Sequence, residues 1–355
     1  MEQHHDLNTM LHKLTQPAFL VDQGLITEVN AAAAACLLQP GQDFSALLET
    51  GHEEYEDFTG GNLFVTLSLA GITRDACVTR MEGGDLVTMD PAQSKEILQL
   101  LGPLSTYMRR VMNGLMTSAD QYIAATGGGN EAAQIYAGQM TRHMYQMVRL
   151  IGNMTHAADY PVAGTMETTE LCSFVAEIWE KALAQTPLLR SRVTYTLPNE
   201  AIFTQVHPEN LERAILNLLC NAVKHSPEGS PVQLRLQKKH QRLLLSVSNT
   251  LADPEHWVAP YNSFLRQPTL LDVDNGSGLG VVLVQNVAAE HGGALLVERI
   301  GDTVRFTLML PITRSNGTQV RSPILSFDYT GELDHCLVEL ADVLPAEVYK
   351  PENLK

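Results

Sequence analysis

The chain has 355 residues and a formal net charge of −16, with 45% hydrophobic and 18% charged residues. This length accommodates two or three domains with sizeable cores, and the composition is that of an ordinary water-soluble protein. So large an excess of acidic charge argues against a general nucleic-acid binder and against a protein that binds anionic membranes.

The sequence also gives expectations about the compartment. Its N-terminus has neither a basic n-region nor an apolar h-region, so we expect no secretory signal. No apolar run reaches the roughly 18 residues of a bilayer-crossing helix, so we expect no membrane span. The five cysteines are scattered without CxxC or another zinc spacing, which indicates free thiols in a reducing compartment. These features predict a cytoplasmic protein.

The first unit, residues 1–90, combines short apolar runs typical of strands with one short helix. Strands are predicted at Pro17–Asp22 and Leu25–Val29, and Asn30 then caps an Ala-rich helix. Further strands are expected at 62–69, 76–80 and 85–89. The unit is therefore predicted to be a small α+β domain.

Residues 17–33 follow the pattern P-x-F-x-V-D-x-G-x-I-x-x-x-N-x-A-A. This pattern resembles the opening of a PAS domain, a small sensory fold. The resemblance implies a sensory domain that binds a small ligand of unknown identity. The alternative is an unrelated α+β module used for dimerisation, and no residue pattern here marks a haem, flavin or metal site.

Residues 91–160 are expected to form two helices joined by a glycine-rich turn at 126–130. Apolar residues in each helix alternate steps of four and three, which gives a seam of period 3.5. The first seam consists of Ile97, Leu101, Leu104, Met108, Val111 and Leu115, and the second of Met140, Met144, Met147, Ile151 and Met154. Two such helices make an antiparallel hairpin, and two hairpins in a homodimer close a four-helix bundle.

A third helix is predicted over 210–227, where apolar residues recur at helical spacing. Asn217 and Asn221 lie four residues apart, and Lys224 and His225 follow, so all four side chains project from one side. Polar groups on an apolar face are costly without partners. Amide oxygens can hold Mg²⁺ and an ammonium group can meet phosphate, so the pattern indicates a magnesium–phosphate ligand. Structural asparagines of a core are the alternative.

A glycine-rich loop lies further along the chain. Its residues are Gly276, Ser277, Gly278, Leu279 and Gly280. The glycines leave backbone N–H groups uncovered, and an apolar helix starts at once, so the loop is expected to cradle phosphate at a helix N-terminus. This helix is predicted to end at His291–Gly293, and strands are expected at 294–298 and 304–310.

The order NLLCNAVKHSP, GSGLG, AEHGG and a strand pair closing at Leu310-Pro311 resembles the ATP-binding domain of sensor histidine kinases, of the GHKL ATPase superfamily, over roughly residues 167–311. The resemblance implies an α/β sandwich that binds Mg-ATP or Mg-ADP, with Asn221 as the Mg²⁺ ligand. It also places the family's dimerisation and phosphotransfer hairpin at 91–160. The implied nucleotide-binding residues are Asn217, Asn221, Lys224, His225, Asn249, Phe264, Arg266, Gly276, Ser277, Gly278, Leu279 and Gly280.

The whole chain is thus expected to be an α+β multidomain protein. The predicted domains are a PAS-like domain (1–90), a dimerising helical hairpin (91–160), a GHKL-type ATPase domain (161–312) and an acidic C-terminal extension (313–355). Within the extension, Leu333–Leu344 has the spacing of one amphipathic helix, which docks either on the body of the protein or on a partner.

The first hairpin helix departs from the family pattern. The family's phosphoacceptor signature is His-Glu-x-x-x-Pro, and alignment on Pro103 puts Leu98 at the histidine and Gln99 at the acidic base. No histidine occurs between His52 and His143, so this helix cannot carry phosphohistidine. We therefore assign no catalytic residue, and His143 remains only as an alternative relay.

The segment that would bind adenine also departs from the family pattern. The segment that usually reads Asp-x-Gly-x-Gly has Asn249 for the aspartate and lacks both glycines. Asparagine keeps a carbonyl acceptor for the adenine amino group. The segment YNSFLR, with Phe264 and Arg266, resembles the Phe-containing box before the ATP lid.

The leading hypothesis is a dimeric, histidine-kinase-like signalling protein that binds Mg-ATP and acts as a sensor or scaffold without histidine autophosphorylation. Its expected partners are a second copy and a response regulator or other signalling protein. One alternative is an active kinase that phosphorylates a partner protein. Another is a nucleotide-free phosphotransfer or docking bundle.

Overall fold

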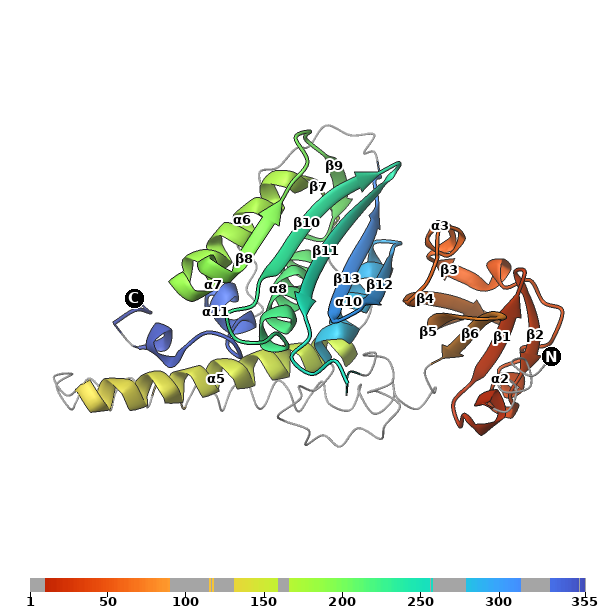
Figure 1. Cartoon of the computed structure of the whole chain (residues 1–355), viewed down its shortest axis with the longest axis horizontal. Coiled ribbons are helices and arrows are strands. Elements are labelled where there is room, and N and C mark those ends of the chain that lie inside the picture. The colour runs from red at the N-terminus through yellow and green to blue at the C-terminus, as the bar shows by residue number, and fades with distance from the viewer. Residues whose placement is uncertain are drawn as a thin grey trace.

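The structure is a computed structural model that describes residues 10–89, 115, 117, 131–158, 166–255, 257, 279–313, 333–350 and 352–354. It is a mixed α+β protein in which one long sheet runs through two units, and a long helix passes beneath the second unit (Figure 1). Among the described helices, none combines the length and the apolar character needed to cross a bilayer.

The N-terminal unit (residues 10–89) contains the expected strands and the short helix. Its elements are β1 (Ala18–Asp22), β2 (Leu25–Val29), α2 (Ala31–Ala35), η1 (Ser45–Leu47), β3 (Leu48–Thr50), α3 (His52–Glu56), β4 (Asn62–Leu69), β5 (Ile72–Met81) and β6 (Gly84–Met89). The cap at Asn30 is confirmed, because its Oδ1 accepts from the N–H of Ala33 at 2.8 Å. The same side chain bonds the backbone of Ala18 and Gln16, which ties the helix start to β1.

The ATPase unit (described residues 166–313) packs helices on one face of its sheet (Figure 1). Its elements are β7 (Glu167–Glu170), α6 (Leu171–Ala184), α7 (Pro187–Arg192), β8 (Val193–Thr196), β9 (Phe203–Val206), α8 (Pro208–Lys224), β10 (Val232–Lys239), β11 (Arg242–Thr250), α10 (Leu279–Glu290), β12 (Ala294–Ile300) and β13 (Thr303–Pro311). In β10, Val232, Leu234 and Leu236 are buried while the residues between them are exposed, which is the period of a strand with one face on a core.

The two units share one hydrogen-bonded sheet of order β2-β1-β6-β5-β4-β12-β13-β11-β10-β8, with β3 on β4. The N-terminal junction, as we name this contact, is the antiparallel pairing of β4 with β12, in which Leu63 lies opposite Leu296. A Cβ at Gly61, which has a φ of +94°, would lie 2.7 Å from the carbonyl oxygen of Val297, so only glycine lets the chain approach β12 this closely. Ion pairs of Arg242 with Glu53 and Glu54 span the same junction.

Helix α5 (Glu131–Ala158) confirms the second helix of the predicted hairpin, but its apolar residues do not form one seam. Met144 and Ile151 are buried against the ATPase unit, whereas Met140 and Met147 are 45% and 41% exposed. The predicted seam therefore straddles the edge of the buried face, because the helix packs on a face centred on residues such as Val148 and Tyr145. Apart from helical residues 115 and 117, the first hairpin helix lies outside the described residues.

The C-terminal segment docks on the body of the same chain. Its elements are α11 (His335–Glu339) and η2 (Ala346–Tyr349), so the helix predicted for Leu333–Leu344 is only five residues long. The predicted apolar positions Leu337, Leu340 and Leu344 are nevertheless buried in the ATPase core. The helix is short because the chain turns after Glu339, and α11 contacts both α5 and α8.

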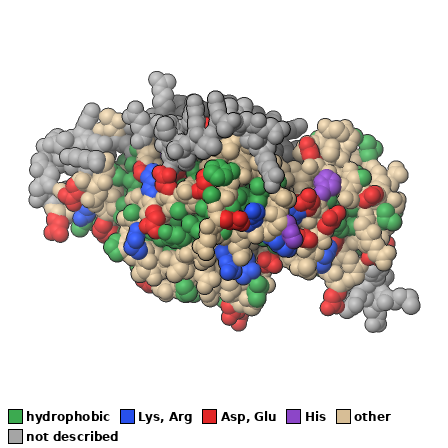
Figure 2. All heavy atoms as spheres, turned by 90° about the horizontal axis from the view of Figure 1, so that it is seen from above, with side chains coloured by type: hydrophobic (Ala, Val, Ile, Leu, Met, Phe, Trp, Pro, Cys, Tyr) green, Lys and Arg blue, Asp and Glu red, His purple; other side chains and the backbone are tan. Residues whose placement is uncertain are grey.

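Charges of both signs lie on the face of the protein that Figure 2 draws. Figure 2 shows acidic and basic side chains interspersed over one face, with hydrophobic side chains gathered toward its middle. Among the described residues, no group of three or more His, Cys, Asp or Glu side chains could hold a metal ion.

Candidate functional site

The candidate site lies where helices α8 and α10 meet. Leu211, Ile215 and Leu219 bury the apolar face of α8 in the core, which fixes the rotation of the helix. Asn217, Asn221 and Lys224 consequently share another side. A Cβ on Gly280 of α10 would lie 2.8 Å from Asn217 Oδ1 and 3.5 Å from Asn221 Nδ2, so the two predicted motifs are in contact.

Glycine at position 280 permits this contact. A Cβ there would lie closer to Asn217 Oδ1 than the 3.0 Å that real Cβ atoms keep, so the buried Asn217 side chain would have to shift. The start of α10 is thereby held beside the amide groups of α8. Backbone N–H groups at a helix start favour anions, which is the arrangement that the sequence predicted for a phosphate cradle.

Asn221 and Lys224, near the C-terminal end of α8, remain partly open. Asn221 is half-buried, and its side chain makes no hydrogen bond to the residues that the structure describes. The Lys224 side chain is 24% exposed and its Nζ lies 3.4 Å from Asp342 Oδ2. An amide oxygen and an ammonium group on one helix face fit a magnesium–phosphate ligand.

Asn217 is placed differently, because it is fully buried. Its Nδ2 donates to Glu339 Oε2 at 2.8 Å and to the carbonyl oxygen of Arg213 at 3.1 Å. Its Oδ1 accepts from Arg149 at 2.9 Å. Direct contact between Asn217 and a nucleotide stays a prediction that requires some of these bonds to change.

The other predicted site residues are distributed as follows. His225 is exposed at the C-cap of α8. Asn249 is buried in β11, where its Nδ2 donates to the carbonyl oxygen of Thr250 at 3.0 Å. Phe264, Arg266, Gly276, Ser277 and Gly278 lie outside the described residues, and only the backbone of Leu279 is described, as the start of α10.

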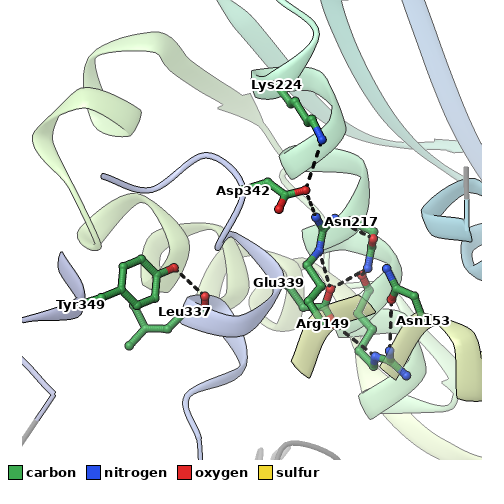
Figure 3. Close-up of polar contacts among 9 residues, drawn as sticks. Arg149, Asn153, Asn217, Lys224, Leu337, Glu339, Asp342 and Tyr349 are labelled. Atoms are coloured by element: carbon green, nitrogen blue, oxygen red, sulfur yellow. Dashed lines mark hydrogen bonds and ion pairs between the residues drawn. The ribbon is translucent and has the colours of Figure 1, made fainter. Parts of the chain in front are cut away.

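A buried ion-pair network lies behind the site (Figure 3). Glu339, which is fully buried, accepts from Arg149 Nε at 3.3 Å and from Arg213 Nε at 3.2 Å. Arg149 Nη1 donates to Asp342 Oδ2 at 2.7 Å. Figure 3 shows Asp342 lying between Arg149 of α5 and Lys224 of α8. Charges buried this deeply are tolerated because each is paired and hydrogen-bonded.

The sequence reasoning missed four members of this network: Arg149, Arg213, Glu339 and Asp342. A pattern that could have found them is the placement of charged residues within apolar helical stretches, such as Arg149 between Val148 and Ile151. Such residues are rarely buried unless they are paired. The pairing itself joins parts of the chain that are far apart, so spacing alone could not reveal it.

Some of the positions considered for a phosphoacceptor lie outside the described residues. Leu98 and Gln99 lie outside the described residues. On α5, His143 is exposed, and the side chain of His156 is not described. The histidine-free first helix therefore remains a deduction from the sequence.

Part of the chain matches a known protein family. Residues 206–314 match the family described as histidine kinase-, DNA gyrase B- and HSP90-like ATPase. The chain is 28% identical over 226 residues to the signal transduction histidine-protein kinase/phosphatase MprB of Mycolicibacterium smegmatis, covering 60% of this chain and 44% of MprB. It is 32% identical over 107 residues to the sensor histidine kinase CusS of Escherichia coli strain K12, covering 29% of this chain and 22% of CusS.

Solved structures of histidine kinases are also similar. Full-length ShkA in complex with AMPPNP has 20% identity and a TM-score of 0.48, covering 61% of this chain and 46% of ShkA. The kinase ThkA in complex with the response regulator TrrA has 17% identity and a TM-score of 0.41, covering 86% of this chain and 98% of ThkA. The chain spans less than half the length of the curated relatives MprB and CusS.

The sequence match over 206–314 defines an ATPase domain of the GHKL class. Residues 206–314 thus form a domain of this ATPase family, and the chain is similar to proteins named as histidine kinases, MprB and CusS.

Proposed function

We propose that this chain is a histidine-kinase-like signalling protein that binds Mg-ATP, or Mg-ADP, where α8 meets α10, and that it lacks the usual phosphoacceptor histidine. The observation that supports this most is the approach of Gly280 to Asn217 and Asn221, with Lys224 on the same helix face. The site joins a Mg²⁺-holding amide, a phosphate-binding cation and a helix start.

The roles of the residues follow from their chemistry. The bound nucleotide would supply Mg²⁺ and a polyphosphate to this site. The amide oxygen of Asn221 would hold Mg²⁺, and Lys224 would offset phosphate charge. Backbone N–H groups at the start of α10 and in the preceding loop would donate to phosphate oxygens. The carbonyl oxygen of Asn249 would accept from the adenine amino group, with Phe264 and Arg266 near the lid.

The chain would then act as a sensor or scaffold in a two-component system of the cytoplasm. Residues 1–90 would form a PAS-like domain for a small ligand, and residues 91–160 a homodimer bundle. The kinship with proteins named sensor histidine kinases favours a response regulator as partner. Light scattering tests the bundle, since Leu104→Glu should convert a dimer into monomer or aggregate by placing like charges in the seam.

Thermal unfolding with and without nucleotide tests the proposed site. Ligand at one hundred times its dissociation constant adds about 2.7 kcal/mol of stability. For a domain of about 150 residues this raises the melting temperature by several degrees. An unchanged melting temperature at millimolar Mg-ATP would count against the proposal.

Incubation with γ-labelled ATP, alone and with response regulators, tests whether the chain lacks histidine autophosphorylation. We expect no acid-labile label on this chain, because Leu98 has no nucleophile and Gln99 cannot act as a carboxylate base. Label on a partner protein would favour an active kinase instead. Label on this chain that disappears in His143→Gln would favour a relay through α5, where His143 is exposed.

A further inference from the structure

The C-terminal clamp, as we name residues 333–350, is built into the core of the protein. Cys336, Leu340 and Leu344 are fully buried. The ring of Tyr349 lies 5.1 Å from that of Tyr145 on α5, and its hydroxyl donates to the carbonyl oxygen of Leu337 at 2.7 Å. The clamp is therefore a specific docked element, placed against α5 and the ATPase unit together (Figure 1).

Backbone contacts position the clamp along α5. Arg142 donates to the carbonyl oxygens of Ala341 and Asp342, each at 3.0 Å. Gly138 faces η2 so closely that a Cβ there would lie 2.6 Å from the carbonyl oxygen of Ala346. These contacts set the turn that carries Asp342 toward α8.

Two carboxylates of the clamp, those of Glu339 and Asp342, occupy donors of the α8 face. Asp342 Oδ2 lies 3.4 Å from Lys224 Nζ and 2.7 Å from Arg149 Nη1. One turn earlier in the clamp, Glu339 accepts from the amide of Asn217 (Figure 3). Asn217 and Lys224 are two of the groups that the proposed nucleotide site would use, and in the docked clamp both hold carboxylates.

A carboxylate and a phosphate compete for the same cation, because both are anions and each repels the other at contact distance. Asp342 lies at Lys224 as a phosphate oxygen would. Asp342 Oδ2 is held in this position by Arg149 and Lys224. The charges at this point therefore favour displacement of the carboxylate when a polyphosphate enters.

We propose that the C-terminal clamp is an intramolecular competitor of the nucleotide phosphates, in which Asp342 holds Lys224 until Mg-ATP displaces it. The inference rests on the proposed nucleotide site. Because coupling is reciprocal, nucleotide binding loosens the clamp by the same factor by which the docked clamp weakens nucleotide binding. Loosening the clamp also releases Arg149, so the nucleotide state is communicated to α5.

Calorimetric titration of full-length protein with Mg-ATP tests the competition in three proteins: wild type, Asp342→Asn and Glu347→Gln. Glu347 is exposed on the same clamp, so its variant removes an equal charge away from Lys224. Asp342→Asn is expected to bind Mg-ATP about fivefold more tightly or better, and Glu347→Gln as the wild type does. Equal affinities in all three proteins, or weaker binding by Asp342→Asn, would overturn the inference.

Hydrogen exchange of the clamp amides separates displacement from a purely electrostatic effect. In the wild type, saturating Mg-ATP should accelerate exchange in residues 336–344, and Mg²⁺ alone should not. Unchanged exchange at saturation overturns the inference and leaves the proposed nucleotide site standing. If neither the wild type nor Asp342→Asn binds Mg-ATP, both the inference and the proposed site are wrong. Binding by Asp342→Asn alone supports both.

Discussion

The N-terminal junction and the C-terminal clamp attach to the ATPase unit by different physical means. At the junction, main-chain hydrogen bonds between β4 and β12 continue one sheet, and ion pairs such as Arg242 with Glu53 lie at its surface. At the clamp, buried charged side chains make the connection, with Glu339 fully buried between two arginines.

The difference predicts how each contact fails. Main-chain pairing depends little on side-chain identity but strongly on close backbone approach. A buried ion-pair network depends on every member, because removing one leaves a buried charge without its partner. The junction should therefore resist charge changes, whereas the clamp should respond to them, including to the charge of a ligand.

Glu339→Ala should give the largest effect. It leaves the buried guanidinium groups of Arg149 and Arg213 without their shared carboxylate, at an expected cost of about 3 kcal/mol or more in unfolding free energy. Urea unfolding measures this cost. Glu347→Ala on the exposed side of the clamp is the control and should change stability by less than about 0.5 kcal/mol. Similar values for the two variants would contradict a buried network.

Gly61→Ala should break the junction through its backbone. The added Cβ would lie 2.7 Å from the carbonyl oxygen of Val297, and the φ of +94° is unfavourable for alanine. We expect a loss of about 1–3 kcal/mol in unfolding free energy. The neighbouring Gly60→Ala is a matched control, since a Cβ there meets nothing within 4 Å. Equal stability of the two variants would show that β4 does not approach β12 in this way.

The clamp should also weaken as pH rises. Burial alone lowers the pKa of His335, but the hydrogen bond to Glu212 and the charge of that carboxylate raise it above its ordinary value. The folded state thus binds this proton more tightly than the unfolded state. Its stabilisation is complete below about pH 6.5 and is lost as pH rises through the folded pKa.

His335→Gln isolates this contribution. The stability advantage of the wild type over this variant should be larger at about pH 6 than at about pH 8.5, by about 1 kcal/mol. Thermal unfolding across the pH range measures both proteins. An advantage that is the same at both pH values would mean that the contact between His335 and Glu212 does not favour the protonated imidazole.

Glu53→Ala should give the smallest effect. The Glu53 side chain is 74% exposed, and it pairs at the edge of the junction with Arg242, whose side chain is 12% exposed. Exposed ion pairs contribute between about 0.2 and 1 kcal/mol, and Glu54 still pairs with Arg242 in the variant. A loss as large as that of Gly61→Ala would indicate that side-chain charges, and not strand pairing, hold the junction.

Sequence reasoning succeeded where a local pattern carries the information. The cap at Asn30 and the apolar face of α8 each depend on neighbours in sequence, and the structure contains both. The meeting of the asparagine helix with Gly280 also followed, because a recognised order of motifs implies their contact in space.

It failed where distant segments decide the outcome. The apolar residues of α5 fit a seam of period 3.5, but only part of that seam is buried. The clamp and the ATPase unit cover a face of α5 that overlaps the seam only in part. Asn217 fitted a ligand-binding pattern, yet its present partners Arg149 and Glu339 come from segments far from α8. No spacing within α8 specifies either partner.

The proposed nucleotide site depends most on Asn221, which would hold Mg²⁺ for a nucleotide between α8 and α10. Calorimetric titration of ATP into the full-length protein, with Mg²⁺ and with the Mg²⁺ removed by chelation, tests this claim directly. The wild type and a surface control, Asn199→Ala, should bind ATP more tightly with Mg²⁺, whereas Asn221→Ala should lose that Mg²⁺ dependence. Wild-type binding that ignores Mg²⁺, or an Asn221→Ala variant that keeps the full dependence, would contradict the assignment.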